Sequence, residues 1–522
     1  MTTTDLSPPG GPAPAGDLAD DKLDRGVLQV AGVVVLGVVM VILDTTVVSV
    51  ALQELMLYFT TDFATIQWTV TGYMLALATV IPVTGWASDR FGTKRLFLIA
   101  IAAFVAGSVL AGAAWDVESL IAFRVLQGFG GGMLMPAGMT ILTKAAGPHR
   151  VGRVMAVLGV PMLLGPISGP ILGGWLVDDY SWRWIFYINL PVGLIALLLA
   201  WRVLPKDDPQ PSEKFDFPGM LMLSPGLAAL IFGLSRIPAE GGVGAVSVLV
   251  PGLAGIALIA GFVLRAMRIA NPLVDLSLFR DRTFTVAVIT MAFFSIAFFG
   301  AMLLFPNYFQ LVREQSALET GLLLIPQGLG AMLTMPVAGR LTDKIGPGKI
   351  VLPGLVLIFA GMLMFTRIEA DTPYWQLLAA LFVLGLGMGA TMMPIMSAAL
   401  ATLKMHQVAR ASTAMNIVQQ TAGAIGSAIM SIVLAGLLAT KFGVATKDSQ
   451  IAATMAMKNP QTHDAAAVMA ADSFASTFIW AVVLIALCLI PALLLPRTAA
   501  EPPADAGELG ERDKDAPPVL VH

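Results

Sequence analysis

The sequence predicts an all-α membrane protein with about fourteen helical spans, because its composition and its patterning agree. Of the 522 residues, 57% are hydrophobic and only 12% are charged, against about a quarter charged in an ordinary soluble domain. Apolar runs recur from Val27 to Leu495, and each reaches the roughly 18 residues that a helix needs to cross a hydrocarbon core. The runs lack the alternation of barrel strands, so helices are the spanning structure that they allow.

The expected spans follow these runs along the chain. They lie at 27–50, 65–85, 96–115, 118–140, 152–176, 184–204, 217–236, 246–264, 283–306, 319–339, 350–367, 375–397, 410–437 and 474–496. An even number of spans puts both tails on one side of the membrane. With both tails in the cytoplasm, most of the 31 lysines and arginines fall in cytoplasmic segments, as the positive-inside rule requires.

Several classes of function are not favoured. A net charge of -3 without a clustered basic face predicts no nucleic-acid partner. The single cysteine, Cys488, and four scattered histidines offer no metal-ligand spacing, so we expect neither a metal nor another cofactor. Residues 1–24 and 498–522 have the composition of disordered cytoplasmic tails. A membrane-embedded enzyme or sensor would call for a catalytic cluster, a nucleotide-binding motif or a soluble domain, and no Walker-type motif is found.

An internal repeat divides the chain. Segment 85–95, GWASDRFGTKR, and segment 339–349, GRLTDKIGPGK, both read G-x-x-x-D-[R/K]-x-G-x-[G/K]-[K/R]. Parallel halves of six spans are typical of one large class of secondary transporter. We therefore expect a six-helix bundle at 25–206, a linker with two extra spans at 207–270, and a second six-helix bundle at 271–497.

The repeated loop resembles the loop motif of the major facilitator superfamily, and further segments resemble its fourteen-span drug:proton antiporter family (EmrB/QacA type). These segments are LDTTVVSVAL at 43–52, RVLQG at 124–128, GPISGPILGG at 165–174, WRWIFYINLP at 182–191, PNYFQ at 306–310 and ALETG at 317–321. The resemblance covers the chain between the tails, with its motifs in the expected order on the expected spans.

The resemblance implies a major facilitator fold, with two six-helix bundles and two extra helices between them. It also implies a proton-coupled efflux transporter that exports amphiphilic, cationic compounds by alternating access. Its partners would be the small substrate, protons and the lipid bilayer of a bacterial-type (inner) cell membrane, and we expect a monomer. The alternative within the superfamily is an exporter of a lipid, a siderophore or a metabolite.

Asp44 and Arg124 are the isolated charges within spans, and such groups are functional hypotheses by default. The first span runs outward and the fourth inward, so the two residues share a depth and could pair directly or through water. Gln127 lies on the same helical face as Arg124. We expect Asp44 and Arg124 to couple transport to protons. The alternatives are a structural ion pair, or an arginine that snorkels to the interface.

The repeated loop motif is expected to act as a conformational latch. Its residues are Gly85, Asp89, Arg90, Gly92 and Lys94, with Asp343 in the second copy. Glycine permits close approach of backbones, and an aspartate can meet a helix N-terminus. The family implies a latch that favours the outward-facing state. The alternative is that these positive loops only fix the orientation of the protein.

Two further groups complete the candidate site. The antiporter motif supplies Gly165, Gly169, Pro170, Gly173 and Gly174, small residues and a proline where helices pack closely and bend. The candidate substrate cavity comprises Gln127, Phe293, Phe294, Met393 and Asn416, since aromatic and methionine side chains suit flat cations. Packing or lipid-facing roles are the alternative for the aromatic and methionine residues.

Overall fold

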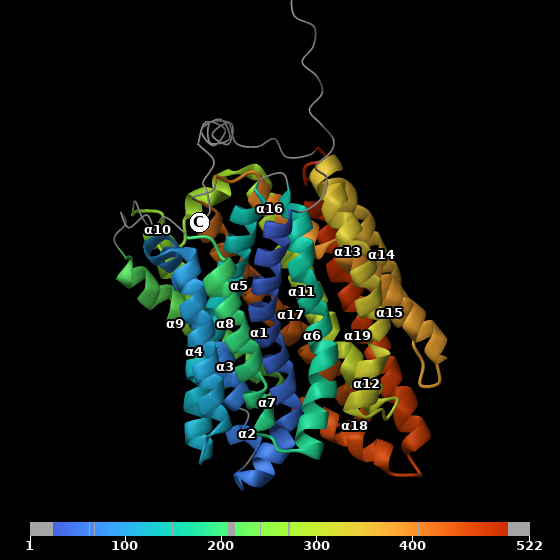
Figure 1. Ribbon diagram of the computed structural model, residues 1–522. Helices are drawn as coiled ribbons and strands as arrows, with labels where there is room; N and C mark the ends of the chain where they lie inside the picture. The colour runs from blue at the N-terminus through green and yellow to red at the C-terminus, as the bar shows by residue number, and fades with distance from the viewer. Residues whose placement is uncertain are drawn as a thin grey trace, which may run out of the picture.

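A computed structural model describes residues 24–498, except 62, 67, 148–149, 207–214, 241, 270–271 and 405–406. All but one residue of each expected disordered tail, and most of the segment before the first extra span, therefore lie outside the described residues. Within the described residues every regular element is a helix, and the helices stand side by side as an upright bundle (Figure 1).

The helices follow one another in this order: α1 (Arg25–Tyr58), α2 (Phe63–Ile66), α3 (Trp68–Phe91), α4 (Thr93–Gly112), α5 (Val117–Ala146), α6 (Val151–Asp179), α7 (Trp184–Tyr187), α8 (Asn189–Val203), α9 (Phe217–Glu240), α10 (Val246–Ala266), η2 (Leu276–Arg280), α11 (Arg282–Leu311), α12 (Ala317–Leu323), α13 (Ile325–Ile345), α14 (Gly348–Phe365), α15 (Tyr374–Gly389), α16 (Met392–Ala401), α17 (Val408–Phe442), η4 (Thr446–Asp448), α18 (Ser449–Lys458) and α19 (His463–Ala492). We call α1–α8 the first half and α11–α19 the second half. The tail side is the end where α1 begins, drawn at the top of Figure 1.

Thirteen segments of the described residues are long and apolar enough to cross a membrane. Each coincides with one of the fourteen expected spans, and the 29-residue helix α6 occupies the remaining one, 152–176. Three spans are each divided into two helices, α7–α8, α12–α13 and α15–α16. Each division lies just before a proline, at Pro191, Pro326 and Pro394, because proline lacks the N–H that would continue the helix.

A run of glycines in α5 brings its neighbours into backbone contact. A methyl group at Gly128 would lie 2.9 Å from the Ala76 Cβ of α3 and closer still to the Tyr73 carbonyl. A methyl group at Gly130 would overlap the backbone of Phe104 in α4. Small residues at helix interfaces allow this approach, which is how helices gain packing energy in lipid. The run directly follows Arg124 and so fixes that residue close to both helices.

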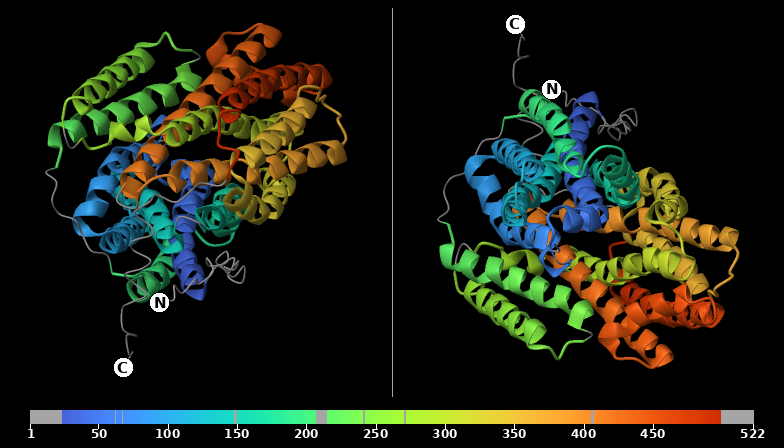
Figure 2. Two further views of the ribbon diagram at one scale, coloured as in Figure 1. Left: turned by 90° about the horizontal axis from the view of Figure 1, so that it is seen from above. Right: turned by 90° about the horizontal axis from the view of Figure 1, so that it is seen from below.

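The two extra helices, α9 and α10, pair with each other at the edge of the bundle (Figure 2). Helix α9 packs against α3 of the first half and α17 of the second half. Trp68 of α3 stacks on Phe232 of α9 with ring centroids 5.5 Å apart. At the tail side, Asp216 accepts hydrogen bonds from the Gly219 amide and from Arg265, so one carboxylate ties the start of α9 to the end of α10.

We expect Gly130→Ala to destabilise the protein by about 1–3 kcal/mol, because the added methyl group must push α4 and α5 apart. The thermal unfolding of the detergent-solubilised protein measures the loss. Gly32→Ala in α1 is the matched control, since a methyl group there meets nothing within 4 Å. Equal unfolding temperatures for the two variants would show that the close approach is unimportant.

Candidate functional site

The carboxylate of Asp44 lies at the centre of a buried polar cluster in the first half. One oxygen, Oδ2, accepts from Arg124 Nη1 at 2.5 Å, and neither side chain has exposed surface. The other oxygen, Oδ1, accepts from Gln127 Nε2 at 2.8 Å and from Asn189 Nδ2 at 3.1 Å. Every described hydrogen bond of the carboxylate is thus with a donor, as suits a group that only accepts.

Arg124 is held from several sides besides its pairing with Asp44. Its Nε donates to the Thr69 carbonyl at 3.1 Å, and its Nη1 also donates to Gln127 Oε1 at 2.7 Å. The guanidinium lies over the Tyr73 ring, 4.1 Å from its centroid, and 5.7 Å from that of Phe186. A buried cation needs such partners, because its desolvation is costly. The structure thus brings Asp44 and Arg124 into direct contact.

Asn189 and Ser108 are polar partners that the sequence analysis missed as site residues. The Nδ2 of Asn189 donates to Asp44 and also to Ser108 Oγ at 3.0 Å, and Ser108 Oγ donates to the Phe186 carbonyl at 2.9 Å. Asn189 lies in the segment WRWIFYINLP, where Pro191 ends α7 and places Asn189 at the start of α8. The family resemblance of that segment was the sequence feature that could have pointed to Asn189.

The antiporter motif of α6 lies against the stretch of α1 that carries Asp44. Methyl groups at Gly165 and Gly169 would overlap Ile42 and Thr46, and one at Gly173 would lie 3.1 Å from the Val47 carbonyl. Gly174 meets nothing within 4 Å, and the Pro170 side chain lies outside the described ones. Helix α6 thus supports α1 one turn on either side of Asp44 and contributes small residues there.

Two ion pairs join the halves at the tail side. Asp89 at the end of α3 pairs with Arg410 of α17, with Oδ2 and Nε 3.3 Å apart. Asp343 at the end of α13 pairs with Arg153 of α6, with Oδ2 and Nε 3.7 Å apart. The two aspartates occupy the same position in the two copies of the repeat, and each meets an arginine of the other half.

The other residues of the first loop motif shape the backbone. A methyl group at Gly85 would lie 2.9 Å from Thr413 Oγ1, so α3 and α17 approach closely at this point. Gly92 has φ of 89° and precedes α4, a conformation that favours glycine. Lys94 donates to the carbonyls of Trp201 and Leu204 at the end of α8, within its own half.

Arg90, the remaining residue of the first loop motif, is exposed at the end of α3. The candidate cavity residues fall into three groups. Gln127 belongs to the Asp44 cluster. Asn416 of α17 donates to the Ser412 carbonyl and approaches Met139 Sδ of α5, at the contact between the halves.

Three candidates belong to the apolar core. Phe294 is 2% exposed and stacks on Phe298 with ring centroids 5.5 Å apart, and Met393 of α16 is fully buried. Phe293 is partly buried against the same core.

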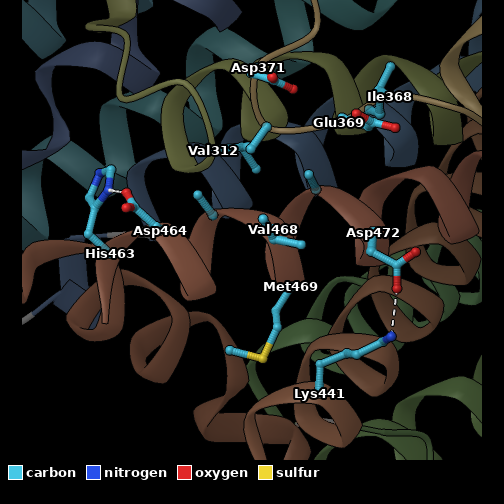
Figure 3. Close-up of a pocket in the computed structure, with 13 residues that line it drawn as sticks. Val312, Ile368, Glu369, Asp371, Lys441, His463, Asp464, Val468, Met469 and Asp472 are labelled. Atoms are coloured by element: carbon cyan, nitrogen blue, oxygen red, sulfur yellow. Dashed lines mark hydrogen bonds and ion pairs between the residues drawn. The ribbon is translucent and has the colours of Figure 1, made fainter. Parts of the chain in front are cut away.

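A pocket of about 760 Å³ lies at the opposite end of the second half from the tail side (Figure 3). Its charged lining comes from the loop before α15 and from the ends of α17 and α19. Lys441 pairs there with Asp472 at 2.6 Å, and His463 lies 3.1 Å from an oxygen of Asp464. It contains no residue of the predicted site. Nearby, segment 441–472, which lies between the expected spans 410–437 and 474–496, forms η4, the short helix α18 and the first turns of α19.

A helical bundle with a repeated loop, a buried ion pair and thirteen apolar segments that could span a membrane defines the class of protein as a multi-pass membrane transporter. The chain belongs to the Major Facilitator Superfamily, whose family model matches residues 34–427. Members of this family are transporters, not enzymes. The fold and the family expected from the sequence are confirmed.

The chain is similar to several curated bacterial proteins. It is 48% identical over 511 residues to a "Multidrug resistance protein B homolog" of Mycobacterium tuberculosis, covering 95% of each chain. It is 30% identical to the "Multidrug export protein EmrB" of Haemophilus influenzae, over 76% of this chain and 78% of the other. It is also 30% identical to the "Tetracenomycin C resistance and export protein" of Streptomyces glaucescens, over 83% and 80%.

Solved structures share the fold at low identity. The human organic anion transporter MFSD10 superposes with a TM-score of 0.59 at 15% identity, over 88% of this chain and 100% of the other. A double Trp mutant of XylE superposes with a TM-score of 0.57 at 16% identity, over 91% and 97%.

We expect Arg124→Met to destabilise the folded protein by about 3–5 kcal/mol at neutral pH, because it leaves the Asp44 carboxylate buried without its cation. The double variant Asp44→Asn/Arg124→Met should recover most of that loss, since both charges are then gone. Thermal unfolding of the purified proteins in one detergent measures both effects. A double variant no more stable than the single one would contradict this account of the pair.

Proposed function

We propose that the protein is a multidrug exporter driven by protons, which exchanges a proton for an amphiphilic, cationic substrate by alternating access. The observation that carries the proposal is the fully buried pair of Asp44 and Arg124 within the spans. An intramembrane acid of this kind is costly and is by default a functional group. The names of the relatives, which refer to multidrug resistance and export, support the substrate class.

Protonation of Asp44 changes the charge of the buried cluster. The ionised pair is close to neutral overall, whereas a protonated Asp44 leaves Arg124 as an uncompensated buried cation. The remaining partners of Arg124 are then the Thr69 carbonyl, Gln127 Oε1 and the faces of two aromatic rings. We infer that this imbalance favours a rearrangement of the first half. Release of the proton on the other side of the membrane restores the pair.

The two ion pairs at the tail side would act as latches. They hold the halves together at that end in the described conformation, and they must break before that end can open. We propose that the tail side faces the cytoplasm, so that this conformation is closed to the cytoplasm. The same proposal gives two six-helix bundles at 25–206 and 271–497, a linker at 207–270, and a monomer in a bacterial cell membrane.

The substrate would bind between the halves. Asn416 lies on α17 where it contacts α5, and Met393 lies on α16, which packs against α6 of the first half. Both are buried in the described conformation. We propose that separation of the tail-side ends uncovers these residues, together with Phe293 and Phe294, to a cationic substrate, which the aromatic faces attract.

We expect Asp44→Asn to abolish substrate efflux driven by a pH gradient in proteoliposomes, because asparagine keeps the size of the side chain but cannot load a proton. The variant should be less stable, because Arg124 loses its anion, but it should remain folded as a mimic of protonated Asp44, which thermal unfolding checks. Dye efflux from whole cells, with and without a protonophore, gives the same comparison.

The matched control for this experiment is Asp216→Asn. Asp216 is also a buried acid bonded to an arginine, Arg265, but it lies between the two extra helices. Its variant should retain proton-driven efflux. Normal efflux by Asp44→Asn would exclude Asp44 as the essential proton carrier.

We expect Asp89→Asn to shift the protein toward the state that is open at the tail side by about fivefold, the factor that about 1 kcal/mol represents. The charge-reversed pair Asp89→Arg/Arg410→Asp should restore much of the original distribution. The labelling rate of a cysteine at Thr413, which faces Gly85 across the halves, measures opening. The native thiol of Cys488 is buried, so background labelling is low. An unchanged rate in Asp89→Asn would argue against a latch.

A further inference from the structure

The hydrogen bonds around Asp44 suit one protonation state only. Arg124, Gln127 and Asn189 each present an N–H to its carboxylate oxygens. An ionised carboxylate only accepts hydrogen bonds, whereas a protonated one carries an O–H that must donate. A buried O–H without an acceptor is costly. Loading of a proton therefore requires that one neighbour reverse its role from donor to acceptor.

Of the three donors to Asp44, Asn189 can become an acceptor with the smallest loss of existing hydrogen bonds. Arg124 has only donors. Gln127 also carries an oxygen, but its Oε1 accepts from Arg124 at 2.7 Å, so a turned amide would point N–H groups at the guanidinium. Among the described residues, Asn189 Oδ1 accepts no hydrogen bond. A half-turn of the Asn189 amide would place this oxygen where Nδ2 now lies, within reach of Asp44 Oδ1.

Other titratable or hydroxyl groups around Asp44 do not offer the same exchange. Tyr73 of α3 is the titratable group next to the pair, besides Arg124; its ring lies beneath the guanidinium, and its buried hydroxyl makes no hydrogen bond to Asp44 that an amide turn could exchange. The hydroxyl of Thr45, beside Asp44 on α1, donates to the Val41 carbonyl at 2.8 Å. Helices α4 and α8 contribute the uncharged Ser108 and Asn189.

We propose that Asn189 is a positioning residue that responds to the protonation of Asp44 by turning its side-chain amide. The inference rests on the proposed function, since it needs Asp44 to load a proton. In the unloaded state Asn189 Nδ2 donates to Asp44 and to Ser108. In the loaded state the proton stays on Asp44 Oδ1, which donates to Asn189 Oδ1, while Gln127 and Arg124 keep their present bonds. The amide itself gains and loses no proton.

Ser108 carries the change onward to the backbone. Its hydroxyl now accepts from Asn189 and donates to the Phe186 carbonyl. Once the amide has turned, the hydroxyl donates to Asn189 Oδ1 instead and releases that carbonyl. Phe186 belongs to the short helix α7, next to the division before α8, and its ring faces Arg124. Protonation of Asp44 thus changes a backbone hydrogen bond at the point where this span is divided.

Infrared difference spectroscopy between high and low pH tests the inference on the full-length protein. The chain contains five asparagines, and isotope labelling of their side-chain carbonyl carbon separates their bands from the backbone. On acidification we expect a new carboxylic-acid band that is absent in Asp44→Asn. We also expect a shift of one labelled amide band that is lost both in Asn189→Leu and in Asp44→Asn.

Asn307→Leu is the matched control. Its amide donates to the Leu303 carbonyl within α11, outside the cluster, so the shifted band should persist in this variant. In proteoliposomes, Ser108→Ala should lower pH-gradient-driven efflux about tenfold, as for one lost buried hydrogen bond. Should Asn189→Leu fail to fold, the loss of the band shift in Asp44→Asn still ties the shifted amide to Asp44, to which Asn189 is the asparagine that donates among the described residues.

The possible outcomes separate the two proposals. An Asp44 acid band with every labelled amide band unmoved would overturn the role of Asn189 and leave the proton-driven exporter intact. No acid band from Asp44 at any pH would overturn the proton-carrier proposal itself. Both bands together, with unchanged efflux in Ser108→Ala, would overturn the relay through Ser108.

Discussion

The buried pair of Asp44 and Arg124 is the constraint on which the first half depends. A carboxylate and a guanidinium with no exposed surface cannot be separated without leaving a charge in a medium of low dielectric constant. Neighbouring helices must supply hydrogen-bond partners for their remaining donors and acceptors. The glycine run of α5 brings α3 and α4 close enough for this, and the small residues of α6 hold α1 in place. The small-residue motifs of α5 and α6 and the ion pair therefore depend on the same close packing of helices.

Helix α3 connects this pair to the contacts between the halves. The part of α3 away from the tail side supplies the Thr69 carbonyl and the Tyr73 ring to Arg124, and its tail-side end carries Gly85 and Asp89. Sixteen residues separate Tyr73 from Asp89, about 24 Å along a helix. A change in the charge of the cluster that shifts α3 along or about its axis would reach the pair of Asp89 and Arg410 through this one helix, which contains Pro82 between Tyr73 and Asp89. The proposed coupling needs no longer chain of contacts.

Much of the fold was predictable because each span must be apolar along its length, and the shared depth of Asp44 and Arg124 followed from the alternating directions of the spans. The partners of the two tail-side aspartates were not predictable. Arg410 and Arg153 lie in helices far from Asp89 and Asp343 in sequence, and no local pattern gives the register between the halves. Ser108 was hidden for another reason, since a lone hydroxyl in an apolar span can satisfy itself on its own helix.

The two halves repeat their loops but not their buried charges. Each half contributes one aspartate and one arginine to the tail-side pairs. The two pairs are therefore related in the same way as the two copies of the repeat. Among the described residues, no charged side chain of the second half is fully buried, since Asp343 keeps 8% exposure at the tail side, whereas Asp44 and Arg124 of the first half have none. Two equivalent ion pairs give neither half a distinct role in opening. A charge that changes in only one half can favour the open or the closed state. The asymmetry therefore supports the proposal that the first half responds to protons while the second half moves against it.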